Sequence, residues 1–157
     1  MSPRRILVIA NETAESLVLR DAIQANLVRG RSAEVVVVAP MLNSRLRHWL
    51  SDEKAARAAA EWRLDRCIVS LAAVGIEGVG CLGDADPLQA IADALRRFRP
   101  DVIVVSTHPE HRSNWLSRGI VGRAERRFGL PVVHVVVEAG HDFIAGAAPA
   151  IARRVAA

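Results

Sequence analysis

The chain has 157 residues, which is the size of one domain with a continuous core. Hydrophobic residues make up 51% of it, but aromatic residues only 4%, so we expect an aliphatic core rather than an aromatic-rich sandwich. The net charge of +4 favours anionic partners. The arginines are spread over several predicted helices and match no nucleic-acid-binding motif, so we do not expect a nucleic acid partner.

The sequence also argues against secretion and membrane insertion. The apolar run that follows Arg4 and Arg5 is only about five residues long, too short for a signal peptide or a membrane span. Cys67 and Cys81 are far apart and belong to no CxxC or Cys/His cluster. We therefore expect a cytoplasmic protein whose thiols stay reduced.

Apolar, β-branched runs predict the strands. These runs do not alternate polar with apolar residues, so both faces of each strand should be buried, as in a parallel sheet. A weaker run at Gly78–Leu82 contains the Gly78-Val79-Gly80 triplet, which we interpret as strand flexibility. The stronger runs are Arg5–Ala10, Glu34–Ala39, Asp101–Ser106 and Pro131–Val137.

Helical patterns fill the gaps between these runs. They cover Ala14–Arg29, Leu46–Val74, Pro87–Arg97 and Trp115–Phe128. Strands and helices that alternate in this way predict an α/β fold, an open five-stranded parallel sheet of order 3-2-1-4-5 with helices on both faces, which is Rossmann-like. Residues 1–138 should form the domain, and residues 139–157 a C-terminal extension, mobile or dimer-docking.

Ligands of open parallel sheets bind beyond the carboxyl ends of the strands. The first strand is usually next to that crevice, so the residues at its end are the first candidates, followed by those that end the second strand. These residues are Ala10, Asn11, Glu12, Thr13, Ala39 and Pro40.

The loop after the fourth strand is rich in hydrogen-bond donors. It lies between a buried strand and a helix, where backbone N–H groups and a helix dipole favour an anion. Arg112 suits a phosphate because its guanidinium can donate two hydrogen bonds. In the alternative interpretation, Ser113 or Asn114 merely caps the helix. The donors are Ser106, Thr107, His108, His111, Arg112, Ser113 and Asn114.

Metal binding and catalysis have weaker support. His108 and His111 lack the further ligands that a metal site needs, so we expect no metal. The P-loop and the motifs of nucleotidyltransferases and pyrophosphatases are absent. Glu12 could act as a base near a phosphate or simply be solvated, so we expect no catalysis beyond slow nucleotide hydrolysis.

The order of these elements resembles the universal stress protein family from about Arg5 to Val137. The resemblance implies an adenine nucleotide ligand such as ATP or AMP, a role in stress response or signalling, and a homodimer through the edge strand Pro131–Val137. The matching pieces are Gly83–Asp84, the helix from Pro87, Asp101–Val105, Ser106–Pro109, Ala124–Arg126 and Pro131–Val135.

The chain departs from the pattern of the ATP-binding family members, G-x2-G-x9-G-[ST]. Ser106 and Pro109 stand at the first two glycines, Gly119 matches the third, and Ile120 replaces the Ser or Thr. Three interpretations stay open. Side chains such as Arg112 and Ser113 replace the lost glycines, or the domain is a dimeric interaction module without a ligand, or it is a weak ATP hydrolase.

Overall fold

The computed structural model contains one five-stranded parallel sheet of order β3-β2-β1-β4-β5, which confirms the predicted α/β fold. The structure describes residues 2–10, 13, 16–25, 27, 32–41, 50–109 and 119–138. The strands are β1 (Arg4–Ala10), β2 (Ala33–Pro40), β3 (Gly78–Gly83), β4 (Val102–Thr107) and β5 (Val132–Val136). The helices are α1 (Leu17–Ala25), α2 (Leu50–Ala72), α3 (Pro87–Leu95) and α5 (Ile120–Phe128).

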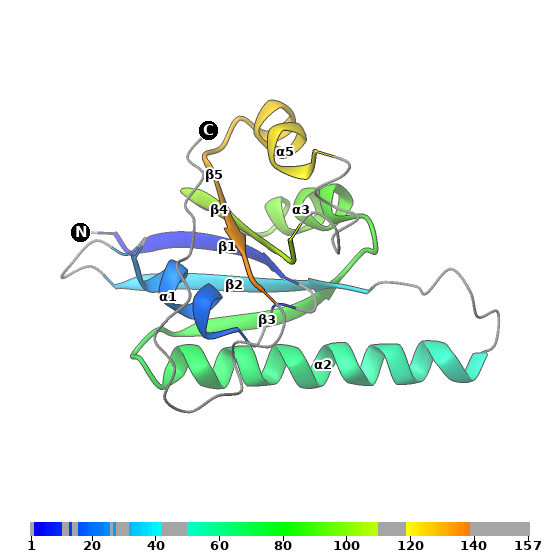
Figure 1. Cartoon of the computed structure of the whole chain (residues 1–157). Helices are drawn as coiled ribbons and strands as arrows, with labels where there is room; N and C mark the ends of the chain where they lie inside the picture. The colour runs from blue at the N-terminus through cyan, green and yellow to red at the C-terminus, as the bar shows by residue number, and fades with distance from the viewer. Residues whose placement is uncertain are drawn as a thin grey trace.

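Helices cover both faces of the sheet. α1 and α2 lie on one side, and α3 and α5 lie on the other (Figure 1). Side chains of a strand alternate between the two faces, so β1 sends Ile6 and Val8 to the α1/α2 side and Leu7 and Ile9 to the α3/α5 side. All four are fully buried, which explains why the strand sequence is a continuous aliphatic run.

The two central strands end at the same level. β1 pairs with β4 so that Ala10 is opposite Ser106, the partners at the carboxyl end of the ladder. β1 also pairs with β2 on its other side, with Ile9 opposite Val38. The carboxyl ends of three neighbouring strands therefore meet at one edge of the sheet, where the sequence analysis places the site.

The glycines of β3 have a packing role. A Cβ at Gly80 would lie 2.7 Å from Cγ of Leu64 on α2, and a Cβ at Gly83 would lie 2.6 Å from Cγ1 of Val38. Both distances are shorter than side chains allow, so these glycines permit close approach to β3. This corrects our interpretation of Gly80 as a point of strand flexibility.

Local sequence signals define the ends of the helices. Asp86 caps α3, because its Oδ1 accepts a hydrogen bond of 3.0 Å from the backbone N–H of Leu88. Gly129 ends α5 with a left-handed φ of 63°, as its place in the sequence predicted. At the other end of the same helix, Gly119 precedes Ile120 with a φ of 60°.

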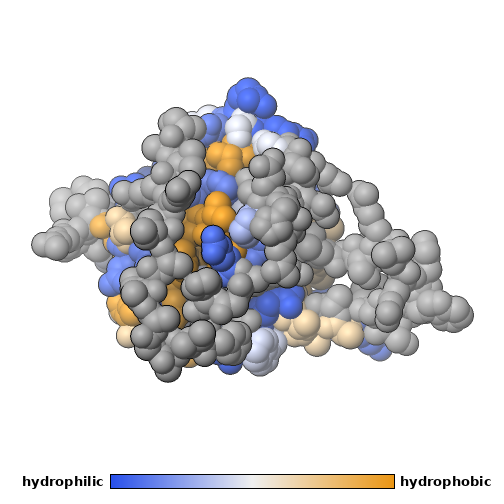
Figure 2. Space-filling view, viewed as in Figure 1, coloured by the Kyte–Doolittle hydropathy of each residue, from blue (hydrophilic) through white to orange (hydrophobic). Residues whose placement is uncertain are grey.

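The described surface carries hydrophobic and hydrophilic residues side by side in the view of Figure 2. Among the described residues, no helix is both long and apolar enough to cross a membrane.

Cys67 is buried and Cys81 is exposed, and both are free thiols. Burial raises the pKa of the Cys67 thiol to about 12, so Cys67 is a packing residue rather than a nucleophile.

Candidate functional site

Thr13 joins the segment after β1 to the end of β4. Its hydroxyl donates a buried hydrogen bond of 3.3 Å to the backbone carbonyl of Ser106. Its own carbonyl accepts a hydrogen bond of 3.1 Å from the N–H of Ser16, just before α1. Two segments that are 93 residues apart in the sequence are therefore held together at the carboxyl edge of the sheet.

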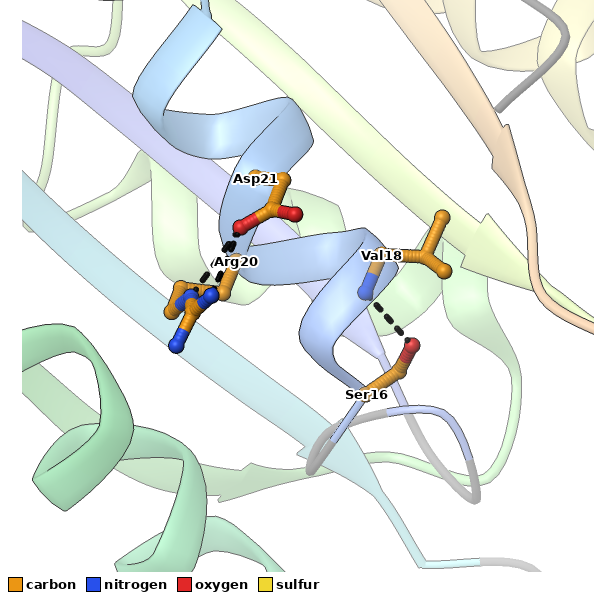
Figure 3. Close-up of polar contacts among 4 residues, drawn as sticks. All are labelled: Ser16, Val18, Arg20 and Asp21. Carbon is orange, nitrogen blue, oxygen red and sulfur yellow. Dashed lines mark hydrogen bonds and ion pairs between the residues drawn. The ribbon is translucent and has the colours of Figure 1, made fainter. Parts of the chain in front are cut away.

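The same hydrogen bonds bring the start of α1 to this edge. The hydroxyl of Ser16 accepts a hydrogen bond of 3.1 Å from the backbone N–H of Val18, so Ser16 caps the helix (Figure 3). One turn further on, Arg20 pairs with Asp21 at 2.9 Å on the surface of α1. The positive end of the helix dipole lies beside the Thr13–Ser106 contact as a result.

Small side chains end the three central strands on the α1/α2 side. Ala10 of β1 and Ala39 of β2 belong to the core cluster on that side, and Ser106 of β4 follows Val104 of the same cluster by two residues. These three side chains are 0%, 1% and 1% exposed. Pro40, the last residue of β2, is buried as well. The ends of these three strands therefore carry small side chains at the candidate site, and these side chains are closed to solvent.

The hydroxyl of Ser106 is a buried polar group whose hydrogen-bonding capacity the described residues leave unused. Its Oγ is inaccessible to solvent and makes no hydrogen bond with any described residue. An unsatisfied buried hydroxyl costs about 1–3 kcal/mol of stability, so such groups are uncommon in folded proteins. A hydroxyl held in this state at the end of a parallel strand suits a ligand that supplies a donor or an acceptor.

Thr107 and His108 face the last strand instead. The Thr107 hydroxyl and Nε2 of His134 are hydrogen-bonded at 2.8 Å, and Nδ1 of His108 lies 3.0 Å from the carbonyl oxygen of Val137. Burial lowers the pKa of His134, which keeps its ring neutral in the core. His134 is therefore a buried histidine whose ring is hydrogen-bonded within the core.

Several predicted site residues lie outside the described residues: Asn11, Glu12, His111, Arg112, Ser113 and Asn114. Gly119 is described and exposed, but no hydrogen bond between described residues links it to Thr13 or Ser106. Within the described ranges, no group of three His, Cys, Asp or Glu residues could hold a metal ion.

Sequence reasoning missed two contributions to the site. It assigned no role to Ser16 and left His134 without a named partner. A signal for the first was present, because a Ser directly before an amphipathic run is a common helix cap. The hydrogen bond of His134 depends on the register between β4 and β5. In this register Val105 is opposite His134, and Thr107 lies two residues after Val105 on the same face of the sheet.

No protein-family model matches the chain, and no curated protein sequence matches it either. Solved structures do match its fold. One is a universal stress protein family member from Burkholderia pseudomallei, 20% identical, with a TM-score of 0.54 and coverage of 83% of this chain and 93% of that one.

Two further matches are structures with bound nucleotides. A universal stress protein family protein from Arabidopsis thaliana with AMP bound is 15% identical and has a TM-score of 0.53, with coverage of 92% of this chain and 97% of the other. The universal stress protein from Archaeoglobus fulgidus in complex with dAMP is 20% identical, with a TM-score of 0.50 and coverage of 85% and 97%. The chain thus has the fold of the universal stress protein structures, as its sequence pattern predicted.

Proposed function

We propose that this chain binds an adenine nucleotide such as ATP or AMP at the carboxyl ends of β1 and β4, as a stress-response or signalling module. The single observation that carries the proposal is the buried Oγ of Ser106, which has no partner among the described residues. A ligand hydroxyl or ring nitrogen that hydrogen-bonds to this group would remove the penalty of the unsatisfied hydroxyl. Nothing in this role requires a metal ion or a catalytic residue.

The surroundings of Ser106 support a ligand that is polar at one end. The start of α1 lies beside Thr13 and favours negative charge through its dipole. The side chains of Ala10 and Ala39, which end the neighbouring strands on the same side, are small and add no bulk next to Ser106. AMP and dAMP are the molecules bound in two structures of the same fold, which makes an adenine nucleotide the first ligand to test.

We assign the phosphate end to the donor-rich segment that follows β4. In this proposal Arg112 and Ser113 take over from the glycines that the family pattern has at Ser106 and Pro109. A side-chain clamp suits this sequence, because Pro109 has no N–H to donate and cannot adopt a positive φ. Arg112 would hold a phosphate by two parallel hydrogen bonds.

The proposal includes a homodimer through the edge of β5. Among the described strands β5 pairs only with β4, so no described strand covers the backbone donors and acceptors of its other edge. Three of its five side chains are buried, which makes the strand suitable for pairing with a second copy. Stress response and a cytoplasmic location belong to the same proposal.

A second candidate function is a dimeric interaction module that binds no nucleotide. The burial of Ala10, Ala39 and Ser106 favours it, because a site that the protein fills itself has no room for a ligand. The two functions differ in one property: only the first predicts that an added nucleotide stabilises the protein.

Titration calorimetry with ATP, ADP and AMP tests the nucleotide proposal. We expect heat of binding from at least one of them, and an Arg112→Ala variant that binds about 10- to 150-fold more weakly, from a loss of about 1.5–3 kcal/mol. Arg99→Ala is the matched control, because Arg99 is exposed just before the amino end of β4. The absence of both heat and a thermal shift with all three nucleotides would reject the proposal.

A further inference from the structure

α2 carries large apolar side chains on its outer side as well as on its inner side. Its inner face packs against the sheet through Ala60, Leu64, Cys67 and Leu71, which are 2%, 6%, 3% and 0% exposed. A helix on the surface of a domain normally carries polar residues on the opposite face. Here the opposite face also carries large exposed apolar side chains, next to charged ones, although α2 lies along the outside of the domain (Figure 1).

The outer face of α2 centres on Trp62 and Val69, whose exposures are 55% and 69%. Single exposed apolar residues are normal, but these two are aligned as a stripe on one side of α2, with the charged Asp65 and Arg66 between them. Ala55 and Ala59 are exposed and lie on the same side as Trp62 at helical spacing. Figure 2 shows weakly hydrophobic surface, in pale orange, over the part of α2 that faces the viewer.

The stripe has the spacing of a helix–helix seam. Ala55, Trp62 and Val69 are seven residues apart, the repeat with which one helix keeps the same side toward a partner helix. Arg66 lies with its guanidinium 4.9 Å from the Trp62 ring, so the stripe also has one polar neighbour that packs over its largest side chain. A seam of this kind needs a second helix to cover it.

We propose that the outer face of α2 binds α2 of a second copy of this chain, with the two helices antiparallel and crossing near Ala59. Charge selects this arrangement. Lys54 and Asp65 are both exposed and lie on the same flank of the seam. With the two-fold axis level with the peptide bond between Ala59 and Ala60, Lys54 of each copy is opposite Asp65 of the other, which gives two symmetric ion pairs.

The same register suits the sizes of the side chains. Ala58 and Ala59 of each copy lie on either side of the crossing point, where small residues let the helix axes approach closely. The ring of Trp62 in each copy covers Ala55 and Ala59 of the other, and aromatic residues of this kind are the usual anchors of protein interfaces. The helices overlap from Leu50 to Val69, so nearly the whole length of α2 is used.

Lys54 makes this arrangement directly testable because it is the only lysine of the chain. A zero-length carbodiimide joins a lysine amine to a carboxylate that touches it. Within one helix, Lys54 and Asp65 are eleven residues and roughly 16 Å apart, too far for this link. A Lys54–Asp65 peptide recovered by mass spectrometry from covalent dimers therefore reports contact between two copies, and specifically through α2 rather than the edge of β5.

Ala59→Arg should halve the molecular mass that analytical ultracentrifugation gives for the assembly, because it places two long cations at the crossing point. Ala72→Arg is the control: it makes the same change at an exposed position beyond the overlap and should leave the mass unchanged. Circular dichroism confirms that both variants are folded.

Charge exchange separates the proposed register from other dimers. Lys54→Asp should raise the dissociation constant of the α2 contact roughly tenfold or more, because acid then faces acid. The double variant Lys54→Asp/Asp65→Lys should restore both the mass and the cross-link. No Lys54–Asp65 link in the wild type, together with an unchanged mass for Ala59→Arg, overturns the proposal, whatever the β5 edge does.

Discussion

Leu7→Ala should lower the free energy of unfolding by about 2–5 kcal/mol, a large loss for a domain whose total stability is about 5–15 kcal/mol. Leu7 lies in the centre of β1, is 0% exposed and packs in the core cluster between the sheet and the α3/α5 layer. Truncation removes buried methyl groups and leaves a cavity that rigid neighbouring strands cannot fill. Urea denaturation followed by far-UV circular dichroism gives the change in unfolding free energy.

Leu17→Ala is the matched control. Leu17 begins α1 and is 44% exposed, so the same chemical change should cost less than about 1 kcal/mol. Equal losses for the two variants would contradict the core that the structure describes.

Ser106→Ala should raise the stability of the ligand-free protein by about 1–3 kcal/mol. The reason is that the variant removes a buried hydroxyl that has no partner among the described residues. The same change should weaken nucleotide binding about 2- to 12-fold, the loss of one hydrogen bond of about 0.5–1.5 kcal/mol. Denaturation without ligand and calorimetry with ligand measure the two effects separately.

Thr107→Val is the control next to it, and its expected effect has the opposite sign. The Thr107 hydroxyl is hydrogen-bonded to His134, so its replacement by a methyl group of similar size leaves the buried ring without this partner. We expect a loss of about 1–3 kcal/mol. If Ser106→Ala also lowered stability, the hydroxyl of Ser106 would have a partner in the ligand-free protein. Its burial would then no longer indicate a ligand.

The strands of this fold could be predicted from sequence because both faces of the sheet are covered. Such strands must be aliphatic throughout. The predicted run Arg5–Ala10 is one residue shorter than β1 at its start, and Glu34–Ala39 is one residue shorter than β2 at each end. β3 gave a weaker signal for a physical reason. It is an edge strand, its Val79 is 68% exposed, and its glycines make room for neighbouring side chains.

Helix packing was harder to predict than helix position. The segment that contains α2 is rich in Ala, and Ala fits a buried face as well as an exposed one. The sequence therefore indicated a helix without showing which side meets the sheet, and a residue such as Trp62 is compatible with either side. Its 55% exposure excludes core packing within this chain, because Leu64 and Leu71 take that place.

The location of the candidate site followed from topology, but its contacts did not. Parallel strands place their carboxyl ends at one edge, so the strand pattern of the sequence is enough to group Ala10, Thr13 and Ser106. Which hydroxyl finds a partner depends on register and on side-chain direction. Thr13 reaches the backbone of Ser106, Thr107 turns to His134, and Ser106 itself stays unpaired among the described residues.

Amide NMR shifts during a titration with AMP test the central claim most directly, namely that the ends of β1 and β4 form one nucleotide site. We predict that the signals of Thr13, Ser106 and Thr107 move together and give a single dissociation constant. Signals at the opposite end of the same strands, such as those of Arg5 and Asp101, should stay in place. Shifts confined to that opposite end, or no shifts at all at saturating AMP, would contradict the account.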